Sequence, residues 1–193
     1  MKVNECHVMS NKVELKPVTR TLSHLRNIDC RGYLRSDGKW DIEATLVDTK
    51  GITLRTPDRP YIGVGEKLHE MKLCVTIDTD MLIHDVHASM DSTPYASCPE
   101  VVQNYQQLIG VTIGGGWQKT IRQLFGGVKG CTHLRELLGP IATVAYQTII
   151  DAKYRQEDYR KNPQVFRNIM NDCYGLREDG PTAPVLWPEF FKS

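Results

Sequence analysis

The sequence lacks an excess of charge of either sign. Among its 193 residues, 24 lysines and arginines stand against 23 aspartates and glutamates, so the formal net charge is only +1. Proteins that bind nucleic acid or anionic membrane surfaces mainly through charge carry a basic stripe or patch. We therefore expect neither nucleic acid nor a membrane among the partners of this chain.

Long apolar runs and paired cysteines are also missing. No stretch stays apolar over the roughly 20 residues that a transmembrane helix needs, and Met1 to Glu5 do not begin a signal peptide. The six cysteines show no CxxC spacing, which argues against zinc fingers, zinc ribbons and thioredoxin-like redox sites. We expect a cytoplasmic protein with reduced cysteines.

Motifs for nucleotides and metals are absent as well. The chain has no Walker loop, no GxGxxG, no GxSxG, no HExxH and no EF-hand loop. No motif therefore predicts a bound group, and we expect no cofactor and assign no metal site.

The length is typical of one domain with an arm or a tail. We predict an N-terminal arm over residues 1–22, a single domain over 23–175 and a C-terminal tail over 176–193. The tail is rich in proline and aromatic residues and is too apolar to stay in solvent. We expect it to pack on its own domain or on a neighbouring subunit, and we expect a homo-oligomer.

Alternating apolar and polar residues predict a first β-hairpin. Its strands cover 22–34 and 39–49, and the turn Ser36-Asp37-Gly38 places a glycine where positive φ is favoured. A three-residue loop gives a consistent register, in which Arg26 and Asp48 are directly opposed. The other pairs are Leu34–Trp40, Gly32–Ile42, Cys30–Ala44, Ile28–Leu46 and Arg31–Glu43.

The opposed Arg26 and Asp48 allow two interpretations. They could form a structural salt bridge at the end of the sheet. Alternatively, Asp48 could orient the guanidinium of Arg26 so that it holds an anionic or phenolic oxygen of a ligand.

A second hairpin is predicted from residues 69–77 and 82–90, which alternate on both sides of a short loop. A four-residue loop would turn His69 and His84 toward the core and His87 toward solvent. The pairs in this register are Ile77–Leu82, Val75–His84, Leu73–Val86, Met71–Ala88 and His69–Met90.

The second half of the chain is predicted to be helical. After a turn-rich junction that contains Tyr95 and Cys98, helical patterns cover about 100–108, 117–125 and 163–171. The expected fold class is α+β, with antiparallel hairpins in one sheet packed against a C-terminal helical layer.

The longest pattern follows a glycine-rich loop and runs to Ala152. Its apolar period continues across Pro140, which predicts one long, kinked central helix. A polar stripe on this helix contains His133, Glu136, Pro140, Thr143 and Gln147. Neighbouring loops could satisfy the stripe, or it could line a pocket with His133 and Glu136 at the mouth. His133 lies in the first turn, where the helix dipole disfavours a charged imidazole.

Four blocks of sequence carry a resemblance to a known family. They read SHLRNIDCRGYLRSDGKWDIEATLVDTK, LHEMKLCVTID, HDVHASMDSTPYASCP and GCTHLRELLGPIATVAYQT. Together, over roughly 19–155, they resemble the bacterial domain-of-unknown-function family 2889, with its GCTHLxELL motif. The resemblance implies a bacterial single-domain protein associated with the breakdown of aromatic compounds, including lignin-derived ones. It implies no catalytic residue.

Our leading hypothesis is a cofactor-independent enzyme that acts on a small phenolic compound. Histidine, carboxylate, arginine and tyrosine side chains between a sheet and a helix suit acid–base chemistry near neutral pH. The expected reaction is a carbon–carbon lyase step that releases formaldehyde. The catalytic candidates are His133, Glu136, Arg26, Asp48, His69 and Tyr95. The substrate-binding candidates are His24, His84, Cys98, Cys131, Thr143 and Gln147.

Two alternatives stay open. The first is a metal-dependent hydrolase or lyase with ligands among Cys98, Cys131, His133 and His69, although this spacing matches no common zinc motif. The second is a protein that binds a small molecule without catalysis.

Overall fold

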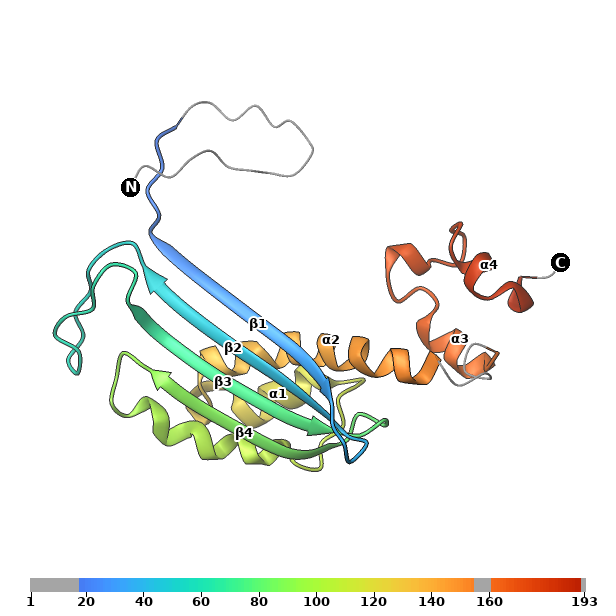
Figure 1. Ribbon diagram of the computed structural model, residues 1–193, viewed down its shortest axis with the longest axis horizontal. Helices are drawn as coiled ribbons and strands as arrows, with labels where there is room; N and C mark the ends of the chain where they lie inside the picture. Colours follow the sequence, from blue (N-terminus) through green and yellow to red (C-terminus); the bar gives the residue numbers. More distant parts are fainter. Residues whose placement is uncertain (1–17, 155–160, 192–193) are drawn as a thin grey trace. The chain divides into compact units, whose positions relative to one another are not determined.

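The computed structural model describes residues 18–154 and 161–191 (Figure 1). Most of the predicted arm, residues 1–17, lies outside the described residues. The chain divides into two compact units, one up to Ala145 and the other from Tyr146 onward. No described helix combines the length and apolar character that crossing a membrane requires.

The first unit contains a four-stranded sheet in the order β1-β2-β3-β4, in which all neighbours are antiparallel (Figure 1). Helices follow the strands in sequence, so the predicted α+β class is confirmed. The strands are β1 (His24–Leu34), β2 (Trp40–Lys50), β3 (Lys67–Ile77) and β4 (Ile83–Ser92).

The register of the first hairpin is as predicted. Leu34 lies opposite Trp40, Arg31 opposite Glu43, and Arg26 opposite Asp48, with the predicted pairs between them also present. Gly38 in the turn has a φ of 82°, a conformation that residues with a Cβ rarely adopt. The turn residues and the alternation therefore specify the same pairing.

The predicted register of the second hairpin is wrong. Ile77 pairs with Ile83 and Thr76 with Asp85, so His84 is an extra residue in a β-bulge. The carboxylate of Asp78 accepts hydrogen bonds from the backbone amides of Asp80 and Leu82, at 2.9 and 3.1 Å, and this lengthens the loop.

The bulge reverses the expected direction of His84. This side chain is exposed rather than turned into the core, and its Nε2 lies 2.7 Å from Oδ2 of Asp78. Beyond the bulge the faces return to their expected sides: Val86 is buried and His87 is exposed. His84 therefore leaves the set of inward-facing candidates.

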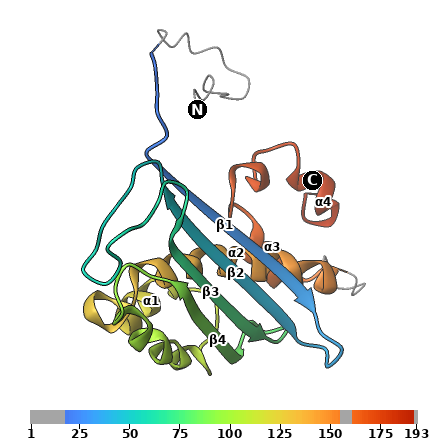
Figure 2. The same cartoon turned by 60° about the vertical axis from the view of Figure 1, so that its left-hand side comes forward.

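The helices of the first unit cover one face of the sheet, as Figures 1 and 2 both show. They are the 3₁₀ helix η1 (Cys98–Leu108), α1 (Trp117–Phe125), the short η2 (Gly127–Lys129) and the part of α2 (Thr132–Tyr154) up to Ala145. The core between the layers contains the predicted sheet residues Trp40, Ile42, Leu46, Leu73, Val75 and Val86.

Helix α2 continues through Pro140, as the apolar period predicts. Leu134, Leu137 and Ile141 on its sheet-facing side are fully buried. The indole Nε1 of Trp117 donates a 2.9 Å hydrogen bond to the carbonyl of Leu138 and so joins α1 to α2. The boundary between the two compact units falls within α2.

The second unit consists of short helices with a small aromatic core. Asn162 caps α3 by accepting a 2.9 Å hydrogen bond from the amide of Gln164. Phe166 stacks on Phe190 with a 4.3 Å centroid distance and meets Trp187 edge-on. The helices after α2 are α3 (Pro163–Ile169), η3 (Tyr174–Leu176), α4 (Ala183–Leu186) and η4 (Pro188–Phe190).

Candidate active site

The carboxylate of Asp48 is the centre of a polar cluster at one end of the sheet. Its side chain has no exposed surface, and the guanidinium of Arg26 binds it through two bonds, Nε to Oδ1 and Nη2 to Oδ2, each 2.7 Å long. Nη1 of Arg26 also contacts the carboxylate of Glu136 on α2. A buried carboxylate needs such partners, because removal from water costs several kcal/mol.

Three imidazoles surround the same carboxylate. Nδ1 of His69 lies 3.0 Å from Oδ2 of Asp48 at hydrogen-bond distance, and Nε2 of His133 lies 3.6 Å from the same oxygen. Nε2 of His24 lies 3.5 Å from Oδ1. We refer to these six residues, His24, Arg26, Asp48, His69, His133 and Glu136, as the Asp48 cluster.

His69 from β3 and His133 from α2 stack face to face, with ring centroids 3.6 Å apart and an interplanar angle of 28°. Two positively charged rings at this distance would repel each other strongly. The contact between sheet and helix is therefore stable when at most one of the rings is positively charged.

The pKa values follow from this arrangement. Burial, together with the neighbouring His133, lowers the pKa of His69 to about 4. Burial also lowers the pKa of His133, more than the nearby Asp48 raises it. Burial opposes ionisation of Asp48, but the hydrogen bond and charge of Arg26 overcome it and keep the pKa of Asp48 below its ordinary value. At neutral pH the cluster therefore contains charged Asp48 and Arg26 beside two neutral imidazoles.

The two neutral imidazoles differ in their free nitrogens. Because Nδ1 of His69 donates to Asp48, its Nε2 carries a lone pair and can accept a proton. That atom has no hydrogen-bond partner among the described residues. His133 instead has Nε2 near Asp48 and Nδ1 3.8 Å from Sγ of Cys131. His69 is therefore better placed to act as a base than His133, the first of the catalytic candidates from the sequence.

The cluster could also hold a metal ion. Asp48, His69 and His133 each offer one ligand atom, and these atoms all lie within 4.8 Å of one another. Two imidazoles and a carboxylate are a common ligand set for divalent transition metals. The double contact of Arg26 with Asp48 opposes this use, because a cation would meet a neighbouring guanidinium. The cysteines proposed as ligands from the sequence are not part of this set.

A family model described as "Protein of unknown function (DUF2889)" matches residues 24–147. The chain belongs to this family. The predicted resemblance is thereby confirmed, and the DUF2889 match includes the whole Asp48 cluster. Neither a curated protein nor a solved structure matches the chain.

The other predicted site residues of this DUF2889 protein are not members of the cluster, although one of them contacts it. Cys131 joins it through His133, whereas Tyr95 is exposed in the junction before η1. Burial raises the pKa of Cys98, and the nearby Cys131 adds to this effect. Thr143 is exposed and donates a 3.4 Å hydrogen bond to the carbonyl of Gly139. Gln147 belongs to the second unit.

Sequence reasoning missed Tyr105, which fixes the loop before α2. Its hydroxyl donates to the carbonyl of Cys131 at 3.0 Å and accepts from the amide of the same residue at 3.2 Å. The ring is fully buried and stacks on Phe125 with a 4.3 Å centroid distance. Its apolar spacing from Leu108 could have indicated burial, but nothing in the sequence indicates the partner.

Sequence reasoning also missed a groove between α1 and the first turns of α2. Its volume is about 430 Å³, and its lining residues are Gln118, Ile121, Arg122, Thr132, Arg135, Glu136 and Gly139. Glu136 belongs both to this groove and to the Asp48 cluster. The arginines were overlooked because they lie outside the predicted polar stripe of α2.

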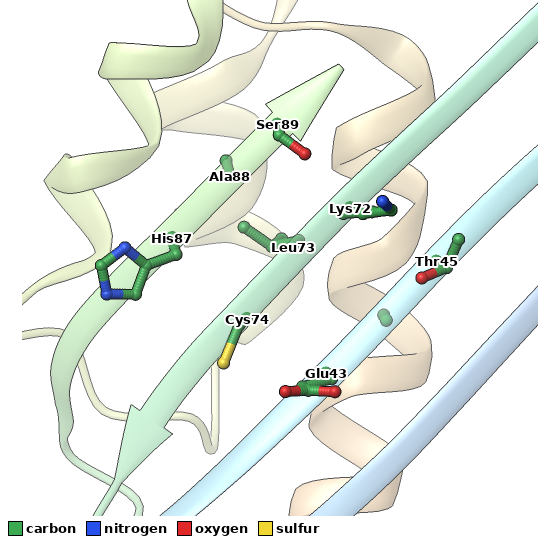
Figure 3. A pocket seen from close by; sticks show the side chains of 9 residues that line it. Glu43, Thr45, Lys72, Leu73, Cys74, His87, Ala88 and Ser89 are labelled. Atoms are coloured by element: carbon green, nitrogen blue, oxygen red, sulfur yellow. The ribbon is translucent and has the colours of Figure 1, made fainter. Parts of the chain in front are cut away.

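A second hollow, of about 280 Å³, lies on the opposite face of the sheet (Figure 3). Burial and nearby carboxylates raise the pKa of its Cys74 thiol to about 12, so this thiol is unreactive at neutral pH. None of the predicted site residues lines it. The lining residues are Glu43, Ala44, Thr45, Lys72, Leu73, Cys74, His87, Ala88 and Ser89.

Proposed function

We propose that this protein is a cytoplasmic enzyme that performs acid–base chemistry on a small phenolic compound without a cofactor. The observation that carries the proposal is the pairing of His69 with Asp48. A buried carboxylate orients a neutral imidazole so that Nε2 is free to take a proton, which is the arrangement of a general base.

Arg26 supplies the second element that such chemistry needs. Its guanidinium has five N–H groups, and three of them contact Asp48 and Glu136. The remaining N–H groups are available to an oxygen that becomes negatively charged during the reaction. A charge that develops beside a fixed guanidinium is stabilised without reorganisation of the site.

The reaction that we propose is a carbon–carbon lyase step with loss of formaldehyde. Nε2 of His69 takes the proton of a substrate hydroxymethyl group, and the O–H electron pair becomes the second C–O bond of formaldehyde. This step needs the quinone-methide form of the substrate, which forms when the phenol loses its proton and a hydroxyl or ether group on the benzylic carbon leaves and takes up a proton. The electron pair of the broken carbon–carbon bond then moves through the conjugated side chain of this quinone methide to its ring oxygen. Arg26 stabilises the resulting phenolate, and His69 returns the proton. We base this choice on the resemblance described from the sequence, which implies an association with the breakdown of aromatic compounds.

The test is incubation with a panel of hydroxymethyl-bearing phenolic compounds, while formaldehyde and product mass are followed. We expect formaldehyde in equal amount to the unsaturated phenolic product. His69→Gln should reduce turnover at least about 100-fold, the usual share of a general base. The matched control is His87→Gln, because His87 also pairs with an aspartate, Asp85, but on the opposite face of the sheet. A folded His69→Gln protein with full turnover would contradict the role of His69 as the base. Failure of the parent protein to release formaldehyde from any compound of the panel would instead favour the non-catalytic alternative.

The second candidate function is a metal-dependent hydrolase or lyase. The observation that favours it is the mutual proximity of ligand atoms from Asp48, His69 and His133. Metal analysis of protein purified without chelator separates the two candidates. A stoichiometric transition metal that is lost on His69→Gln substitution, together with activity, would replace the acid–base proposal by this one.

A further inference from the structure

The groove between α1 and α2 is lined by two arginines, one from each helix. Arg122 from α1 and Arg135 from α2 both line it, and neither forms an ion pair with a residue in 18–154 or 161–191. Of the eight other arginines of these ranges, five form ion pairs. They are Arg26, Arg31, Arg35, Arg59 and Arg177.

The acid of the groove does not neutralise this charge. Glu136 lines the groove, but its carboxylate already contacts the guanidinium of Arg26. Gln118 and Thr132 add an amide and a hydroxyl that make no hydrogen bond to a described residue. The groove thus presents two guanidinium groups and two neutral side chains that can donate hydrogen bonds to a ligand.

The rest of the lining suits a ring. Ile121 is buried below the groove and presents an apolar side chain, and Gly139 has no Cβ. A Cβ added at Gly139 would meet no atom within 4 Å, so the space beside it is open. A volume of about 430 Å³ lies in the range of small-molecule sites, roughly 300–1,000 Å³.

We infer that this groove binds the carboxylate of a small aromatic acid, which is the substrate of the Asp48 cluster. Guanidinium groups bind carboxylates through paired, charge-assisted hydrogen bonds. Glu136 lines the groove and also contacts Arg26, so the groove meets the Asp48 cluster at this side chain. That the bound acid is a substrate rests on the proposed function. That the groove binds a carboxylate does not depend on it.

The test is isothermal titration calorimetry of the full chain with 4-hydroxybenzoate and with 4-hydroxybenzamide, which has the same shape without the charge. The acid should bind at least about tenfold more tightly than the amide. Arg122→Gln and Arg135→Gln should each weaken binding of the acid about tenfold and leave the amide unaffected. Lys119→Gln removes a charge from the same helix outside the groove and should leave both affinities within about twofold.

A further variant blocks the groove without disturbing the fold. Gly139→Leu places a side chain in open space on a helix and should abolish binding, while the thermal midpoint stays unchanged or rises. Equal binding of acid and amide, or binding of the acid that survives the Arg122→Gln/Arg135→Gln double change, would overturn the inference. Tighter binding of inorganic phosphate than of 4-hydroxybenzoate would also overturn it, because the groove would then recognise phosphoryl groups.

Failure here is distinguishable from failure of the proposed function. Formaldehyde release from neutral phenols that does not depend on Arg122 or Arg135 would overturn the carboxylate site and leave the acid–base proposal intact. A His69→Gln protein that keeps full turnover and still binds 4-hydroxybenzoate through Arg122 and Arg135 would instead overturn the role of His69. That result would leave the carboxylate site intact.

Discussion

Arg26 and Asp48 face each other across β1 and β2 and share two hydrogen bonds of 2.7 Å, with no surface of the Asp48 side chain exposed. A comparable pair occurs on the other face of the sheet, where Nε and Nη2 of Arg31 contact Asp29 at 2.6 and 3.0 Å. Both residues of that second pair are exposed. The two pairs allow the effect of burial to be separated from the effect of hydrogen bonding.

Asp48→Asn should lower the free energy of unfolding by about 3 kcal/mol, because it leaves a partly buried guanidinium without its anion. Asp29→Asn should change stability by less than about 1 kcal/mol, since exposed ion pairs contribute little. Urea unfolding monitored by circular dichroism measures both values. Equal losses in the two variants would contradict a role for Asp48 as the buried centre of the cluster.

The opposed Arg26 and Asp48 were predictable, whereas the direction of His84 was not. In the first hairpin, alternation, turn length and Gly38 agree on one register. In the second hairpin the side chain of Asp78 captures two backbone amides and lengthens the loop, which forces a bulge at His84. Such side-chain to backbone bonds compete with ladder pairing and leave little trace in a hydrophobic pattern.

A change of pH should affect stability through His69. Its pKa is about 4 in the folded protein and 6.5 in an ordinary imidazole, so the unfolded chain binds more protons between these values. The contribution of neutral His69 to the free energy of unfolding is therefore fully present above about pH 6.5, and it is lost as the pH falls toward 4. The total is on the order of 3 kcal/mol.

Urea unfolding at a series of pH values measures this decline. His69→Gln should flatten the dependence in that interval, while His87→Gln should leave it as in the parent protein. A pH dependence that is identical in the parent and in His69→Gln would show that His69 does not titrate as described.

Tyr105→Phe should lower the free energy of unfolding by about 1–2 kcal/mol, because it leaves the amide and carbonyl of Cys131 without their partner. Tyr95→Phe is the matched control, since Tyr95 is exposed and should tolerate the change. Thermal and urea unfolding measure the difference. Equal stability of the two variants would mean that the Tyr105 hydroxyl does not fix the loop before α2.

The composition of the cluster was predicted better than its geometry. The sequence predicted that Arg26 lies opposite Asp48 and that His69 points toward the core, and both are observed. Phase alone gives no distance between elements, so the stacking of His69 on His133 and the contact of Arg26 with Glu136 could not be foreseen. The groove arginines were missed for a related reason, because a groove is defined by two helices together.

The stacked imidazoles lead to a prediction about the pH profile of catalysis. If His69 is the base, kcat/KM in the parent protein should stay high down to about pH 4 and fall below it, because only neutral His69 can accept a proton. His133→Gln removes a group that lowers the pKa of His69, so the acidic limb should move upward toward the ordinary value for an imidazole. The maximal rate should fall less than in His69→Gln. Steady-state kinetics between pH 3.5 and 8, with brief exposure to acid, would measure both effects. If His133 were the base instead, His133→Gln would abolish turnover and leave no limb to shift.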